Sequence, residues 1–126
     1  MKATISQEDY LETIYDLSVD GAEVKSVDVA RARDVSRASI NKAIPGLRDG
    51  GFIEQEPYGK ITLTKKGLNL AKEIRKRHDI IKSFLEDVLG VVPAVAEEEA
   101  CKIEHVVSAD TIKKLCAFIN KTPKVK

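Results

Sequence analysis

The sequence has few cysteines, no long apolar run and almost no net charge. Its two cysteines are predicted to lie on separate helical faces, so we expect reduced thiols and no disulfide. No run of about 18 apolar residues occurs, and the N-terminal residues lack the apolar segment of a signal peptide. We therefore expect a cytoplasmic chain that does not cross or bind a membrane. With 126 residues, 43% of them hydrophobic, it can form one compact unit or two small ones.

The net charge of +1 hides an uneven distribution. Residues 1–22 carry one basic and five acidic side chains, and residues 78–126 carry seven basic and eight acidic ones. Residues 23–77 hold thirteen Lys and Arg against seven Asp and Glu, a local charge of +6. A basic middle segment in a neutral chain indicates a local surface for a polyanion, although many solvated helices carry similar runs.

Residues 6–49 show the periodicity of three helices. The first is predicted to begin at Ser6 and to end near Gly21, with apolar residues at helical spacing. A short second helix follows Ser26, and Ser36 is placed to cap a third after a tight turn. Two short helices joined in this way are typical of a helix-turn-helix.

Residues 52–64 alternate as two short strands around Pro57, Tyr58, Gly59 and Lys60, which predicts a hairpin. Three helices followed by a hairpin make a winged helix. The predicted fold is therefore mainly α, with an N-terminal winged helix-turn-helix that has a two-stranded wing. A long helical pattern from Thr64 to Gly90 leads to a second helical unit, so we expect domains at residues 1–73 and 74–126.

The segment "ACKIEHVVS", residues 100–108, contains a cysteine, a glutamate and a histidine in close succession. Cys101, Glu104 and His105 are three and four positions apart, which places them on one face if the segment is helical. This spacing is typical of a metal site. A free cysteine by itself is more often a small buried apolar residue, and the predicted place of Cys116 on an apolar helical stripe indicates core packing for that one.

Three segments in this order carry a resemblance: "SQEDYLETIYDL" (6–17), "RHDIIKSFLEDVLGV" (77–91) and "EEEACKIEHVVS" (97–108). Together with the winged helix, they resemble the diphtheria toxin repressor and manganese transport regulator family of metal-dependent transcriptional repressors. The resemblance covers nearly the whole chain. It implies a homodimer that binds double-stranded operator DNA when loaded with Fe(II) or Mn(II), and that represses metal-uptake genes. It also implies that the second domain serves dimerisation and metal binding.

The resemblance also implies a set of metal ligands. Cys101 stands where the iron type has cysteine, whereas Asp9 stands where the manganese type has aspartate, so Mn(II) and Fe(II) both remain candidates, with Zn(II) or another divalent metal possible in vitro. One arrangement of a second metal position in the family needs ligands where this chain has Lys82 and Glu97, and we do not expect that arrangement here. The implied ligands are Asp9, Glu12, His78, Cys101, Glu104 and His105.

These residues have simpler interpretations as well. His78 follows three basic residues and can merely extend a solvated face. Asp9 and Glu12 can interact with the dipole at the start of the first helix. The metal-ligand interpretation requires these side chains to meet in space, which sequence does not show.

DNA contacts are expected from the start of the third helix, because that part of a helix-turn-helix enters the major groove. Basic and amide side chains there can contact phosphate or base edges, and Ala38 can meet a thymine methyl group. Pro45 removes a backbone donor, so we predict a kink or an early end of this helix. The DNA-contact candidates, with a lysine from the hairpin, are Ser36, Arg37, Ala38, Ser39, Asn41, Lys42 and Lys60.

Two other classes of function fit part of the pattern. A metal-independent winged-helix regulator or protein-interaction module would bind its partner with or without metal. A metalloenzyme could use such a site to activate water, but no nucleophile, phosphate loop or substrate-pocket motif accompanies it. We therefore expect a DNA-binding regulator that is not an enzyme and takes no small-molecule substrate.

Overall fold

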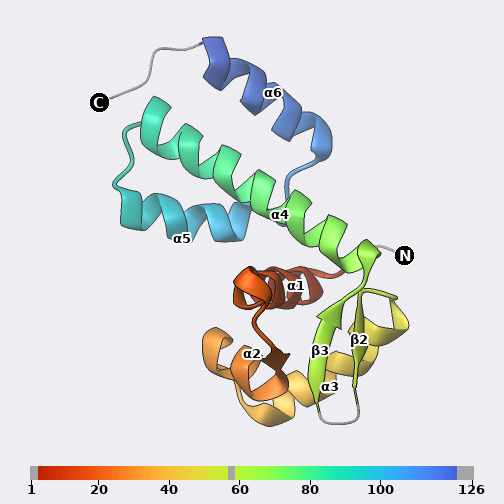
Figure 1. Ribbon diagram of the computed structural model, residues 1–126. Helices are drawn as coiled ribbons and strands as arrows, with labels where there is room; N and C mark the ends of the chain where they lie inside the picture. The colour runs from red at the N-terminus through yellow and green to blue at the C-terminus, as the bar shows by residue number, and fades with distance from the viewer. Residues whose placement is uncertain (1–2, 57–58, 122–126) are drawn as a thin grey trace. The chain divides into compact units, whose positions relative to one another are not determined.

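The computed structural model describes residues 3–56 and 59–121 and divides the chain into two units, Met1–Lys72 and Glu73–Lys126 (Figure 1). The first unit begins with α1 (Ile5–Leu17), which starts one residue before the predicted start at Ser6. The Thr4 hydroxyl accepts a hydrogen bond from the Gln7 N–H, and the Gln7 side chain accepts one from the Thr4 N–H. This capping box satisfies two donors at the helix start, so Thr4 and not Ser6 is the cap.

Helices α2 (Ser26–Arg33) and α3 (Arg37–Asp49) form the predicted helix-turn-helix. The connection turns at Asp34, whose positive φ of 54° is a conformation that Asp tolerates better than most residues. The Val35 N–H donates to the Ala30 carbonyl, and the Ser36 hydroxyl accepts from the Ser39 N–H at the start of α3. These bonds define where one helix ends and the next begins.

The sheet of the first unit has three antiparallel strands in the order β1-β3-β2. The predicted hairpin is present as β2 (Ile53–Gln55) and β3 (Lys60–Leu63), while its expected turn residues 57 and 58 lie outside the described ranges. The third strand, β1 (Val24–Lys25), pairs with Ile61 and Lys60 of β3. Two residues are too few to show an alternating pattern, so the sequence did not predict β1. A short 3-10 turn, η1 (Val19–Gly21), lies between α1 and β1.

Pro45 neither ends α3 nor prevents the helix from continuing to Asp49, contrary to the predicted early end. Proline removes only the hydrogen bond to the Asn41 carbonyl. Asn41 and Pro45 are both exposed, so water can reach this carbonyl. Burial of Ile44 and Leu47 holds the second half of the helix in place.

An apolar core joins the elements of the first unit. It is formed by buried side chains from α1, α2, α3 and the sheet, including Leu11, Val29 and Leu47. Gly67, in the first turns of α4 (Lys65–Ser83), lies against the backbone of Phe52 so closely that a Cβ would come within 2.0 Å of the Phe52 carbonyl oxygen. This position accepts only glycine, because the neighbouring atom is backbone and cannot rotate away.

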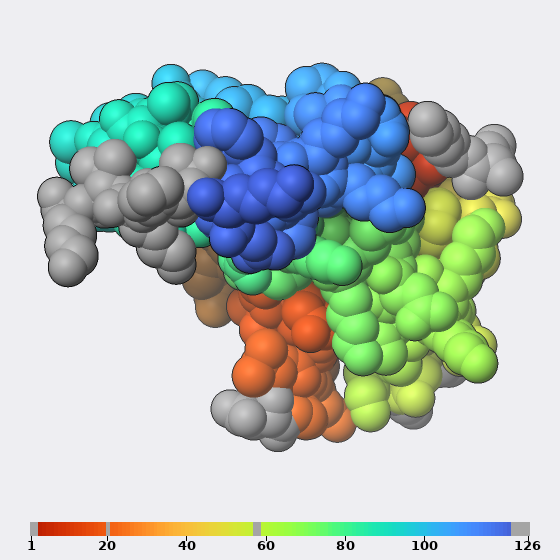
Figure 2. Space-filling view, turned by 90° about the horizontal axis from the view of Figure 1, so that it is seen from above, coloured from red at the N-terminus to blue at the C-terminus, as the bar shows by residue number. Residues whose placement is uncertain are grey.

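The second unit contains the rest of α4, a π-helical turn η2 (Phe84–Val88), α5 (Pro93–Ile103) and α6 (Ala109–Lys121). The predicted long helix is thus regular only to Ser83 and continues as a π turn before Gly90. Figure 1 shows α4 between α5 and α6, and Ile81, Ala100 and Ile112 form the buried contact of the three. Figure 2 shows α6, in blue, at the surface of this unit. None of the described helices is long and apolar enough to span a membrane.

Candidate metal centre and nucleic-acid interface

His78 lies on the buried face of α4 because its neighbours one turn away, Ile74 and Ile81, are buried apolar residues. Its side chain is only 1% exposed, so it does not extend the basic solvated face of residues 75–77. A buried polar side chain requires polar partners. In His78 both ring nitrogens have carboxylates beside them.

The two carboxylates approach His78 from α5 and from the residue that ends it. Nδ1 lies 2.8 Å from Oε1 of Glu104, which is completely buried. Nε2 lies 2.9 Å from Oε2 of Glu97, whose side chain is half exposed. An imidazole with a carboxylate at each nitrogen is stabilised in its doubly protonated, charged form when no metal is bound.

These contacts move the pKa values of His78 and Glu97 in opposite directions. Burial by itself lowers the pKa of His78, but the contacts with Glu104 and Glu97 outweigh it and raise the pKa above 6.5. Burial by itself raises the pKa of Glu97, but the neighbouring His78 outweighs it and lowers the pKa below 4.5. A metal cation at this place would replace the proton on the imidazole and keep the favourable charge pairing.

Cys101 completes a group of three different ligand types in the second unit. Its Sγ lies 3.7 Å from Nδ1 of His78 and 3.6 Å from Oε2 of Glu97. One ligand atom from each of these residues lies within 4.8 Å of the others. Imidazole nitrogen, carboxylate oxygen and thiolate sulfur together fit a divalent transition metal, whereas calcium and magnesium prefer oxygen alone.

The end of α5 differs from the sequence prediction. The helix ends at Ile103. Glu104 and His105 lie beyond this end, so they are not part of the helical face that carries Cys101. Glu104 retains helical backbone angles, and its N–H donates to the Ala100 carbonyl. The guanidinium of Arg77 donates to the Glu104 carbonyl at 2.8 Å. Arg77 therefore holds the segment that presents the Glu104 side chain to His78.

The six predicted ligands are divided between the two units. His78, Cys101, Glu104 and His105 belong to the second unit, and contacts within it join the first three. Asp9 and Glu12 lie one turn apart on α1 in the first unit. Asp9 also forms an ion pair with Arg33, at 3.3 Å.

Glu97 is the residue of this group that was left out of the predicted ligands, because the resemblance gave its position only to a second-metal arrangement that was not expected here. The available signal was its position four residues before Cys101, which is one helical turn. It is the first of three consecutive glutamates, and apart from the resemblance nothing in the sequence distinguishes it from Glu98 and Glu99. Only contact with a side chain on another helix, His78, separates them.

The start of α3 presents the predicted DNA-contact residues to solvent. Arg37, Asn41 and Lys42 are exposed, while Ile40, Ile44 and Leu47 bury the opposite face. The same exposed surface includes Ser36, Ala38 and Ser39. An exposed basic and polar helix start, supported by an apolar face, is what major-groove contact requires. Lys60 begins β3 and lies 3.9 Å from Glu23, so it faces a neighbouring carboxylate in the free protein.

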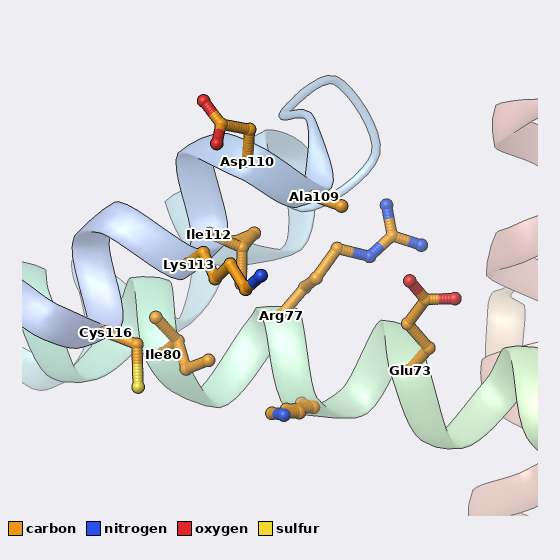
Figure 3. A pocket seen from close by; sticks show the side chains of 9 residues that line it. Glu73, Arg77, Ile80, Ala109, Asp110, Ile112, Lys113 and Cys116 are labelled. Carbon is orange, nitrogen blue, oxygen red and sulfur yellow. The ribbon is translucent and has the colours of Figure 1, made fainter.

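A cavity of about 480 Å³ lies between α4 and α6 in the second unit (Figure 3). Its lining includes Arg77 and Ile80 from α4 and Ile112, Lys113 and Cys116 from α6. Cys116 therefore lies beside a cavity and is half-buried. It is less enclosed than the core packing predicted for it from the sequence. The lining of the cavity contains one cysteine and no histidine, so it lacks the ligand set found around His78.

Comparison with protein families and relatives identifies both halves of the chain. The N-terminal DNA binding domain of iron dependent repressors matches residues 2–61, and their metal binding and dimerisation domain matches residues 64–124. An HTH-type transcriptional regulator of Methanocaldococcus jannaschii is 37% identical, with 92% of this chain and 94% of that one covered. The transcriptional regulator MntR of Salmonella typhimurium is 40% identical, with 88% and 70% covered.

Solved structures show the same fold. The manganese regulator SloR superposes with a TM-score of 0.82 at 29% identity, covering 97% of this chain and 56% of SloR. A manganese-dependent transcriptional repressor in complex with manganese superposes with a TM-score of 0.84 at 26% identity, covering 92% and 53%. The chain spans about half the length of these solved proteins.

Proposed function

Because the chain belongs to the iron-dependent repressor family, we propose that it is a repressor that binds operator DNA as a homodimer when Fe(II) or Mn(II) is bound. It acts in the cytoplasm and controls genes of metal uptake. The observation that carries this proposal is the buried His78 with two carboxylates and a thiol around it. A buried charged cluster of this kind is costly to fold, so its presence in a small domain indicates a function.

The proposed ligands come from both domains. His78, Cys101, Glu104 and His105 of the second domain would hold the ion together with Asp9 and Glu12 of α1. When bound, the ion supplies positive charge that several carboxylates can share. The thiolate favours iron, zinc or copper, while the carboxylates and imidazoles also suit manganese. Asp9 would exchange its ion pair with Arg33 for the ion.

The proposed DNA contacts come from α3 and the wing. Arg37 and Lys42 reach phosphate or guanine, and Asn41 is suited to adenine. Ala38 and Ser39 lie on the same exposed helix start, where Ala38 meets a thymine methyl group. Ser36 at the N-terminus of α3 and Lys60 of β3 contact phosphates of the DNA backbone.

Regulation would follow from sharing the ligands between the domains. Ligands on α1 and on the segment after α5 fix the angle between the DNA-binding and dimerisation domains when they bind one ion. The two recognition helices of a dimer must lie about 34 Å apart to enter successive major grooves, and only some angles allow this. A hundredfold preference of the metal for the binding conformation would shift the equilibrium by about 2.7 kcal/mol.

Apolar surface on the second domain supports the homodimer. Leu89 is 59% exposed, Val92 is 64% exposed and Phe118 is 50% exposed. Phe118 also makes an edge contact with the ring of Phe84, at 6.1 Å between centroids. Large apolar side chains that are half or more exposed are the ones that a second copy would cover in such a dimer.

The experiment that tests the function is fluorescence anisotropy of labelled operator DNA, selected from random sequences, with Mn(II), anaerobic Fe(II), Zn(II) or chelator. Binding should require metal, and the order of the metals identifies the effector. Glu104→Gln and His105→Ala should lose metal-dependent binding, whereas the exposed control Glu98→Gln should retain it. Equal binding with metal and with chelator would instead support a metal-independent winged-helix regulator.

A further inference from the structure

The cavity between α4 and α6 is lined, among the residues that the structure describes, by none of the proposed metal ligands or DNA contacts. Its volume is about 480 Å³, and its lining residues lie between positions 73 and 80 on α4 and between 109 and 116 on α6 (Figure 3). All of them belong to the second unit. Pockets that hold small molecules measure about 300–1,000 Å³, so this cavity has the size of a ligand site.

Part of the cavity lining is apolar. Ile112 of α6 is buried, and Ile80 of α4 and Cys116 of α6 are half-buried. Figure 3 shows Ile80 and Cys116 at the same end of the cavity. Such a lining favours the hydrocarbon part of a ligand, because that part leaves water when it binds.

The lining also carries an excess of positive charge. It contains three basic residues, Lys76, Arg77 and Lys113. Two acidic residues, Glu73 and Asp110, oppose them. The Asp110 carboxylate pairs with Lys114 at 3.0 Å, and Figure 3 shows it turned away from Arg77. An apolar cavity with this charge favours an occupant that has an anionic group.

Arg77 connects the cavity to the segment that carries Glu104. It lines the cavity, and its guanidinium donates a hydrogen bond to the Glu104 carbonyl at 2.8 Å. A guanidinium has several N–H donors in a planar fork, which matches the two oxygens of a carboxylate. A carboxylate in the cavity therefore competes with the Glu104 carbonyl for Arg77.

We propose that this cavity binds an aliphatic monocarboxylate of medium chain length, and that its occupant weakens metal binding. The carboxylate pairs with Arg77 and Lys113, and the chain lies against Ile80, Ile112 and Cys116. The effect on metal rests on the proposed function, because it acts through the segment that carries a proposed metal ligand. Binding of the carboxylate itself does not depend on that function.

Octanoate is the probe, titrated calorimetrically into the full chain in the presence of chelator. One octanoate should bind per chain. Octanol, which lacks the charge, should bind about tenfold more weakly or worse. Acetate, which lacks the chain, should also bind about tenfold more weakly or worse. Amide chemical shifts in NMR spectra should change mainly in α4 and α6.

Variants of α6 test the two parts of the cavity. Cys116→Phe fills the apolar part and should weaken octanoate binding by about tenfold or more. Lys113→Gln removes one positive charge and should weaken it by about threefold or more. The matched control Lys121→Gln changes an exposed lysine of the same helix that lies outside the cavity, and it should bind octanoate as the wild type does. Circular dichroism checks that each variant keeps its helices.

The effect on metal is measured by titrating Mn(II) and following the free ion by electron paramagnetic resonance. Saturating octanoate should weaken Mn(II) binding by about threefold or more, and Mn(II) should weaken octanoate binding by the same factor. Lys113→Gln at the same octanoate concentration controls for direct binding of Mn(II) by octanoate, and its Mn(II) affinity should change less.

Absence of octanoate binding to the wild-type chain would overturn the proposal, as would equal octanoate affinity of the Lys113→Gln and Lys121→Gln variants. Binding that disappears as the chain dimerises would also overturn it, since a second copy would then cover the cavity. An unchanged Mn(II) affinity would overturn the coupling through Arg77. A chain that binds octanoate but binds no metal would contradict the proposed function and leave the carboxylate site in place.

Discussion

The two units of this small chain are stabilised in different ways. The first unit has a core of twelve buried apolar residues among those described, gathered from α1, α2, α3 and the sheet. The corresponding core cluster of the second unit has three, and its buried polar residues are His78 and Glu104. The first unit is therefore stabilised mainly by apolar burial, whereas the second buries a charged pair whose contribution depends on protonation.

This difference corresponds to the two proposed roles. A DNA-reading unit must keep α3 in one position, and a continuous apolar core does this. A sensing unit must change its stability or conformation when an ion binds, and a buried charged cluster provides that dependence. The predictions that follow test this difference between the two units.

The largest effect is expected from Leu47→Ala in the first unit. Leu47 is completely buried, so removing its side chain leaves a cavity and should lower the free energy of unfolding by about 2–5 kcal/mol. Urea denaturation measures the loss, and hydrogen exchange locates it in α1, α2 and α3. The control Val106→Ala changes a residue that is 71% exposed and should have little effect. Similar losses for both variants would contradict the apolar-core account of this unit.

Metal should stabilise the second unit selectively. At a free metal concentration one hundred times the Kd, binding should add about 2.7 kcal/mol to the stability of the structure that holds the ligands. Hydrogen exchange of α5 amides, with and without metal, measures this directly. His78→Gln should abolish the gain because the central ligand is removed. Amides of α3 near Leu47 serve as the reference, because they report on the first unit, which supplies fewer ligands. Protection spread equally over α3 and α5 would contradict the assignment.

The metal-free second unit should show a pH window of maximum stability. The raised pKa of His78 contributes stability that is fully present below 6.5 and is lost as the pH rises through the folded-state pKa. The lowered pKa of Glu97 contributes stability that is present above 4.5 and is lost as the pH falls through its folded-state value. Both contributions are therefore fully present between pH 4.5 and 6.5, and the stability of the second unit should decline on either side of this range.

Hydrogen exchange of α5 in chelator, corrected for the intrinsic pH dependence of exchange, measures this profile. His78→Gln should remove the decline on the alkaline side. The acid-side decline should be weaker because the Glu97 carboxylate is half exposed and therefore partly screened by solvent. A profile with no decline above neutral pH would show that the His78 contacts do not stabilise its charged form.

The smallest effect is expected from Lys114→Ala on α6. Lys114 pairs with Asp110 at 3.0 Å, but both side chains are more than 70% exposed. Exposed pairs of this spacing contribute about 0.3–0.5 kcal/mol. Urea denaturation of the variant should therefore nearly superpose on the wild-type curve. A loss above 1 kcal/mol would mean that this part of α6 is buried in the folded protein, as at a dimer interface.

The elements of the fold that could be predicted are those with a periodic pattern of apolar residues along the sequence. The helix-turn-helix, the hairpin and the second helical unit have periodicities of 3.6 or 2 residues that extend over several turns or residues. The strand β1 is only two residues long and forms because β3 offers it an edge to pair with. The early end predicted for α3 at Pro45 was wrong because tertiary burial of Ile44 and Leu47 outweighs the lost hydrogen bond.

For the proposed metal site, the sequence by itself determined the candidate ligand types and the resemblance that connects them, since "CKIEH" and its spacing are local. Only the tertiary structure placed His78 in a buried position, brought Glu104 to one nitrogen and Glu97 to the other, and ended α5 at Ile103. The physical reason is that spacing along one helix fixes which residues share a turn. It does not fix which side chain of another helix they meet, and that depends on how α4 and α5 pack through Ile81 and Ala100.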